Sequence, residues 1–181
     1  MVTNKLGADY DYSKIVLDGP IDLQKHFEQE RKVKAGVTVY PGRFVSGNGE
    51  TEGEIDLAAA GDGIASFIEI VLHEAPMGYR SAIIVDGTPE IDRALGAGKF
   101  VTTLRQSNPH GGLFKVVCWR ADESSATELG EMMALEADGM CKTFAYTDTA
   151  QDTDLMTDCV GRCANVTADE AGDDISQEIY F

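Results

Sequence analysis

The chain has 181 residues, with 31 acidic against 15 basic side chains and a formal net charge of −16. A hydrophobic content of 43% is typical of a folded domain, and this length can bury a sizeable core without metals or disulfides. Binding to a phosphate backbone depends on clustered Lys and Arg, so the charge argues against nucleic acid as a partner. An acidic surface keeps a protein soluble and would also suit a high-salt habitat.

The sequence carries no sign of a membrane segment. No apolar run approaches the roughly 20 residues that cross a bilayer, and the first ten residues lack the apolar core of a signal peptide. We therefore expect no membrane partner and synthesis in the cytoplasm.

Residues 1–20 are polar and rich in turn formers, which predicts an extended N-terminal arm. Isolated aromatic and aliphatic side chains in such an arm gain most by docking on a partner. The candidate contact residues are Tyr10, Tyr12, Ile15, Val16 and Leu17. The alternative is that the arm packs back on its own domain. Residues 21–33 fit either a short helix or a charged strand.

Most of the remaining chain has the pattern of strands, and we expect residues 21–181 to form a single, mainly β domain with a small barrel. Residues 34–42 and 96–104 each place an Ala-Gly step before a β-branched run. Asp86-Gly87 predicts a hairpin turn. The exception is residues 122–138, where a Ser or Asp cap, early acidic residues and Gly139 as a stop predict an inserted helix.

Two patterns indicate internal repetition. Residues 159–181 repeat the order found around residues 62–71, a short apolar run after a patch rich in Ala, Asp, Gly and Thr. The two Ala-Gly steps are the second pattern. The alternative is a set of unrelated strands that share common turn chemistry.

Several segments together carry a resemblance to a known family. They are Ala-Gly-Val-Thr-Val-Tyr-Pro-Gly-Arg-Phe-Val (35–45), Gly-Ile-Ala-Ser-Phe-Ile-Glu-Ile (63–70), Asp-Gly-Thr-Pro-Glu-Ile (86–91), Ala-Gly-Lys-Phe-Val (97–101) and Asp-Cys-Val-Gly-Arg-Cys-Ala-Asn-Val-Thr (158–167). This order resembles the capsid decoration, or cement, proteins of tailed bacterial or archaeal viruses. The resemblance covers residues 33–181, and residues 121–146 depart from it as an apparent insertion.

The resemblance implies a virion structural protein that is not an enzyme. Such a protein binds the outer capsid surface and cements neighbouring subunits of the major capsid protein. It also implies self-association as a homotrimer, because the family usually decorates local threefold junctions.

The candidate catalytic and metal-binding residues do not form the pattern of a known catalytic or metal site. Cys159 and Cys163 can face one core as small hydrophobes, and we expect free, buried thiols, with a disulfide or metal pair as the alternative. The segment Ser107–Gly112 holds His110 but lacks the other members of a catalytic triad. Asp148, Asp152 and Asp154 alternate as in a calcium loop, without its central glycine and distal glutamate. We expect no cofactor and no metal.

Two other classes of function remain as alternatives. A carbohydrate- or receptor-binding module of a virion spike would use Trp119 and the tyrosines as a stacking platform, although the neighbours of Trp119 favour a core position. A small β-scaffold hydrolase would need clustered acids and a phosphate-binding glycine loop, and the sequence shows neither arrangement.

Overall fold

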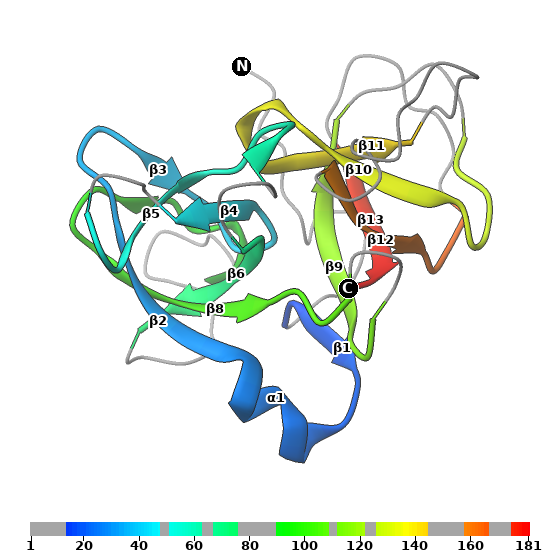
Figure 1. The fold of residues 1–181 in the computed structure, drawn as a ribbon, viewed down its shortest axis with the longest axis horizontal. Coiled ribbons are helices and arrows are strands. Elements are labelled where there is room, and N and C mark those ends of the chain that lie inside the picture. The colour runs from blue at the N-terminus through cyan, green and yellow to red at the C-terminus, as the bar shows by residue number, and fades with distance from the viewer. Residues whose placement is uncertain are drawn as a thin grey trace.

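A computed structural model describes residues 14–47, 51–62, 67–75, 90–108, 112–121, 126–144, 158–166 and 175–181. Tyr10, Tyr12 and the Asp86-Gly87 hairpin lie outside these residues. The described chain is mainly β, as predicted, and Figure 1 shows its strands gathered into two groups side by side. Its helices are α1 (Ile21–Phe27) and the short 3-10 segments η2 (Glu90–Asp92) and η3 (Ala137–Gly139). Among the described residues no helix has the length and apolar character to span a membrane.

The first group contains a closed barrel with strand order β2-β5-β4-β6-β8, which we call the N-terminal barrel. Its strands are β2 (Glu28–Val33), β4 (Phe44–Gly47), β5 (Glu54–Leu57), β6 (Glu69–Glu74) and β8 (Phe100–Arg105). The short strands β3 (Thr38–Val39) and β7 (Leu95–Gly96) pair with each other beside it. Its interior contains an apolar cluster that includes Val33, Val45, Ile55, Val71 and Val101.

The second group is a six-stranded sheet of order β1-β9-β11-β10-β12-β13. Its strands are β1 (Val16–Asp18), β9 (Lys115–Arg120), β10 (Met132–Glu136), β11 (Met140–Thr143), β12 (Cys159–Cys163) and β13 (Ile175–Tyr180). An additional pairing of β13 with β9 joins the two ends of the β9 to β13 series. Those five strands therefore form a second closed barrel, the C-terminal barrel. β1 pairs with β9 at Lys115 and Val116, whereas β11 pairs with it at Arg120.

The two barrels share one topology. In each, the first strand in chain order runs parallel to the third, β2 to β5 and β9 to β11. The second strand (β4 or β10) pairs with both the third and the fourth. The fifth strand (β8 or β13) pairs with the fourth and with the first, which closes the ring. All of these pairs are antiparallel. The chain therefore contains the same barrel twice, and the predicted internal repetition is confirmed.

The pairing registers of the two barrels also coincide. Val33 lies opposite Ile55 in the first parallel pair, as Arg120 lies opposite Cys141 in the second. Equivalent backbone bonds follow, since Lys34 donates to Ile55 and Ala121 donates to Cys141. Continuing around each ring aligns further positions: Arg31 with Cys118, Lys32 with Trp119, Glu69 with Gly161, Val71 with Cys163, Phe100 with Ser176, and Arg105 with Phe181.

The turn before the second strand is repeated as well. Gly42, before β4, has a φ of 83° and Gly130, before β10, has a φ of 79°. Gly42 donates to the carbonyl of Val71, and Gly130 donates to the carbonyl of the equivalent residue Cys163. A left-handed glycine in this place lets the chain reverse directly into the strand.

Only one of the two repeat patterns in the sequence corresponds to the two barrels. The similarity between residues 62–71 and 159–181 corresponds to β6 and β12, which occupy equivalent places in the two rings. The Ala-Gly steps do not mark repeats. Gly36 and Gly98 lie in two turns of the N-terminal half, and Gly98 donates to the carbonyl of Val33.

The helix predicted over residues 122–138 is wrong within the described residues. Residues 126–131 lead through the Gly130 turn into β10, and only Ala137–Gly139 form a 3-10 segment. β10 pairs with β11 on one side and β12 on the other, so ladder bonds and burial outweigh the helix preference of Met, Ala, Leu and Glu. β10 and β11, which lie within residues 121–146, complete the C-terminal barrel. In the part of the chain that the structure describes, α1 is the one α-helix, and residues 21–33 hold both this helix and the strand β2.

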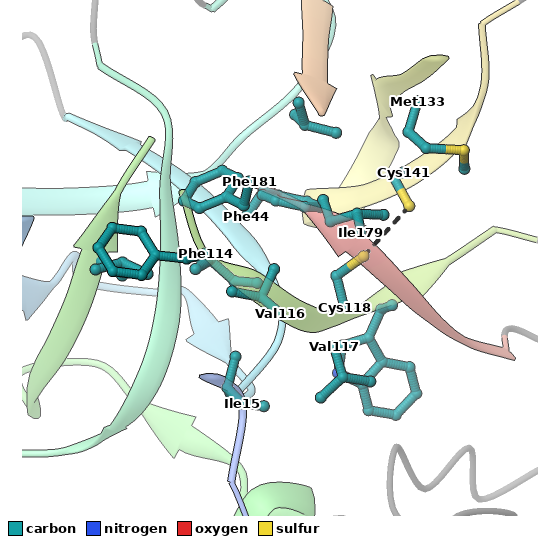
Figure 2. Packing of buried hydrophobic residues seen from close by; sticks show 14 of the residues in the cluster. Ile15, Phe44, Phe114, Val116, Val117, Cys118, Met133, Cys141, Ile179 and Phe181 are labelled. Carbon is teal, nitrogen blue, oxygen red and sulfur yellow. Dashed lines mark hydrogen bonds between the residues drawn. The ribbon is translucent and has the colours of Figure 1, made fainter. Parts of the chain in front are cut away.

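One large core cluster joins the barrels. It contains residues of the N-terminal barrel such as Phe44 and Leu104 together with Val116, Val117 and Ile179 of the other. Figure 2 shows Phe44 against Phe181, whose ring centroids lie 5.7 Å apart. β9 is buried on both faces, because its inner face lines the C-terminal barrel and its outer face packs toward the first.

Candidate functional site

The residues predicted to contact a partner are placed differently from expectation. Ile15 is fully buried and Val16 is 6% exposed, both in the large core cluster. Val16 pairs with Val116 on β9, and the carbonyl of Ile15 accepts a hydrogen bond from Val117. Leu17 is half-buried against the same cluster. Residues 15–17 therefore belong to the fold and not to a free arm, and burial removes Ile15 and Val16 from any partner surface.

Trp119 is also buried, so it offers no stacking platform for a carbohydrate. Its Nε1 donates to the carbonyl of Pro41 at 2.8 Å, and its backbone N–H donates to Gly42. The Arg43 guanidinium lies 4.6 Å from the centroid of its ring, and the Tyr40 ring lies beside it. Trp119 is the point at which the turn before β4 docks on the C-terminal barrel.

The four cysteines are free and buried, as expected. Cys118 Sγ lies 3.5 Å from Cys141 Sγ in the C-terminal barrel, as Figure 2 shows. Burial raises the pKa of the Cys118 thiol well above its usual range, and the hydrogen bond with Cys141 raises it further. Burial likewise raises the pKa of Cys159 and Cys163. The raised pKa values keep the thiols of Cys118, Cys159 and Cys163 protonated, which makes these three poor nucleophiles.

A polar cluster inside the N-terminal barrel was not predicted. Arg31 donates from Nε and Nη2 to the carboxylate of Glu69, with distances down to 2.6 Å, and Thr103 donates to the same carboxylate. The hydrogen bond with Glu69 raises the pKa of Arg31. Glu69 is only 3% exposed, and two donors keep its charge satisfied. The sequence contained one sign of this cluster. Arg31 lies two positions before the inward-facing Val33, and side chains two positions apart in a strand face the same side.

Near this cluster an aromatic side chain reaches solvent. Phe67 is 65% exposed, and the Arg105 guanidinium lies 4.1 Å from the centroid of its ring. Arg105 Nη2 also approaches Glu69 at 3.9 Å. The Arg105 guanidinium thus lies between the exposed Phe67 ring and the buried Glu69 carboxylate. These two contacts hold the guanidinium and the ring in place at this surface.

The other sequence candidates show structural roles where the structure describes them. Ser107 Oγ accepts from the N–H of Leu113 and donates to the carbonyl of Phe181, so it holds the last residue of the chain. His73 Nδ1 lies 3.2 Å from the carbonyl of Glu74. His110 and the acidic segment 148–154 lie outside the described residues. Within the described residues no group of His, Cys, Asp and Glu is arranged to hold a metal ion.

Comparison with known proteins assigns no family to the chain. No protein-family model matches it, and no curated protein matches it.

Proposed function

We propose that this protein is a capsid decoration protein, which binds the outside of a viral shell and cements neighbouring subunits of the major capsid protein. The sequence resemblance over residues 33–181 motivates this proposal. The observation that carries it is the duplicated barrel, which puts two similarly shaped modules in one chain. A shell presents the same subunit many times at fixed spacing, so two linked modules gain from multivalent binding.

The surface that best fits a shell contact is the exposed Phe67 ring with Arg105 beneath it. Aromatic residues and Arg are the types that dominate binding energy at protein interfaces. Covering the ring would remove Phe67 from water and bring a partner carboxylate within reach of Arg105. This surface replaces Ile15 and Val16, which are buried, while Tyr10 and Tyr12 remain candidates from the sequence.

Sedimentation with empty capsid shells tests the proposal. The shells are assembled from the major capsid protein of the same virus, which a neighbouring gene would identify. We expect the wild-type chain to pellet with the shells and Phe67→Ser to weaken binding by about tenfold or more. Leu113→Ser, at another exposed apolar position, is the matched control and should bind like wild type. If the folded wild-type chain stays in the supernatant at every ratio of chain to shell, the capsid role is wrong.

A further inference from the structure

Beside the shared core, one turn of the N-terminal barrel docks on the outer face of the C-terminal barrel. The turn Tyr40-Pro41-Gly42-Arg43 covers Trp119, with hydrogen bonds from Trp119 to Pro41 and Gly42 and with the Arg43 guanidinium over the indole ring. Pro41 and Gly42 are buried in this contact. The turn before the second strand of the N-terminal barrel is therefore a docking element.

The equivalent turn of the C-terminal barrel is Glu128-Leu129-Gly130-Glu131, and it is uncovered. Its backbone repeats the first turn, because Arg43 donates to Tyr40 and Glu131 donates to Glu128. Leu129, at the position of Pro41, is 68% exposed. The fold thus presents a second copy of the docking element with an exposed apolar side chain at its tip and a carboxylate on each side.

The equivalent of the docking surface is uncovered on the N-terminal barrel. Trp119 and Ser176 face each other across β9 and β13, and the pairing registers align them with Lys32 and Phe100 across β2 and β8. Each pair carries one aromatic ring on the outer face of its barrel. In contrast to the buried Trp119, Phe100 is 54% exposed and the Lys32 side chain is 45% exposed.

We propose that a second copy of this chain occupies these two open surfaces, with the Glu128–Glu131 turn of one copy on the Lys32 and Phe100 face of the next. The two surfaces are complementary. Leu129 meets the exposed Phe100 ring. The carboxylates of Glu128 and Glu131 approach the Lys32 ammonium, which within its own chain pairs with Glu54 at 2.9 Å, while Glu131 also accepts a hydrogen bond from the N–H of Glu128. The N–H of Lys32 already donates to Gly53, so side chains make the contact in place of the backbone bond that Trp119 makes to Gly42.

This contact is head to tail, since it joins two different surfaces. Such contacts close into rings when the rotation between copies permits, and they extend into filaments when it does not. The inference does not depend on the capsid role, because it concerns only copies of this chain. If the contact between copies fails its test, the proposal of shell binding still stands. If shell binding fails its test, the contact between copies still stands.

Cross-linking between two single-cysteine additions tests the contact directly. Copies carrying Leu129→Cys and larger, tagged copies carrying Phe100→Cys are mixed and treated with a short bis-maleimide. We expect a hybrid dimer, whereas the native thiols are buried and should react slowly. Val166→Cys replaces Leu129→Cys in the control, because Val166 is 61% exposed and lies outside the turn. Equal hybrid yield from the control and the test pair would refute the contact.

Sedimentation velocity of the unlabelled protein gives an independent measurement. The wild-type chain should self-associate with rising concentration, and Leu129→Asp should lower the association constant by about tenfold or more. Val166→Asp adds the same charge at an exposed position and should leave the constant nearly unchanged. A wild-type chain that stays monomeric up to millimolar concentration overturns the proposal, as does an equal effect of the two substitutions.

Discussion

At the scale of single residues, the two barrels share a backbone topology and register but differ in the side chains of their interiors. The registers align Arg31 with Cys118 and Glu69 with Gly161. One interior holds an ion pair where the other holds a thiol and a glycine. An ion pair and an apolar replacement of suitable volume can stabilise a fold about equally. The duplication therefore constrains the backbone and the turns more tightly than it constrains the side chains within.

Glycines at equivalent positions offer a matched test of packing. Gly53 and Gly139 precede β5 and β11 with φ of 79° and 68°. A Cβ on Gly53 meets nothing within 4 Å, whereas a Cβ on Gly139 would lie 2.3 Å from the Phe44 carbonyl oxygen. We expect Gly53→Ala to cost about 1 to 2 kcal/mol from backbone strain. Gly139→Ala should cost about 1 to 3 kcal/mol more from the clash.

Urea denaturation of both variants measures the difference. The Gly53 variant supplies the control, because it carries the same backbone strain without the clash. Equal losses of unfolding free energy would mean that the Phe44 carbonyl does not approach Gly139 as described.

The thiols of Cys118, Cys159 and Cys163 should make stability fall at alkaline pH. The pKa of Cys118 is raised in the folded state, so the unfolded chain releases this proton first. The contribution is fully present below the unfolded thiol pKa of about 8.5, and it is lost as pH rises toward the folded value. Each pH unit above about 9 should cost up to about 1.4 kcal/mol per thiol. Urea denaturation between pH 7 and pH 10 checks this, and Cys118→Ala should show a shallower decline than the wild-type chain.

At the scale of elements, neighbours decided what each segment became. β1 precedes the N-terminal barrel in sequence but pairs with β9 of the C-terminal barrel. The described part of the chain therefore starts beside the C-terminal barrel, crosses through α1 to build the N-terminal barrel, and then returns to build the C-terminal barrel. β1 joins the two halves of the fold, which the polar composition of residues 1–20 does not reveal.

Ile15 should therefore be a stability residue. Its side chain is fully buried in the shared core, so Ile15→Ala should lower the unfolding free energy by about 2 to 5 kcal/mol. Ile21 on α1 is 76% exposed, and Ile21→Ala should stay within about 0.5 kcal/mol of wild type. Thermal denaturation of both variants measures this. If both unfold at the wild-type temperature, residues 14–18 behave as the free arm that the sequence predicted.

At the scale of the whole molecule, charge and symmetry set the conditions for assembly. Each copy carries −16, so copies repel one another at low ionic strength. At about 0.15 M salt the screening length falls to about 8 Å, which leaves short contacts between complementary groups as the main electrostatic contribution. Added salt should therefore favour association up to the point where it screens those contacts as well.

The homotrimer expected from the family resemblance is a prediction at this scale. Light scattering should give a mass near three times 19.5 kDa at raised ionic strength and a smaller mass at low ionic strength. Fixed-concentration measurements across a salt series separate charge screening from mass action. A monomer under both conditions, even near millimolar protein, would contradict the trimer.

The sequence by itself predicted the β class, the burial of Cys159 and Cys163 and the correspondence of residues 62–71 with 159–181, because each depends on local composition and on alternation along a strand. The tertiary structure decided the rest. Met132–Glu136 became a strand because strands on both sides took up its backbone bonds, and Ile15 became core because β9 lies beside it. The repeat of the turns at Gly42 and Gly130 was present in the sequence but hidden, since Pro41 and Leu129 differ while their backbones coincide. Contacts between residues far apart in the chain are set by the closing of each barrel, and no local pattern encodes which strand closes on which.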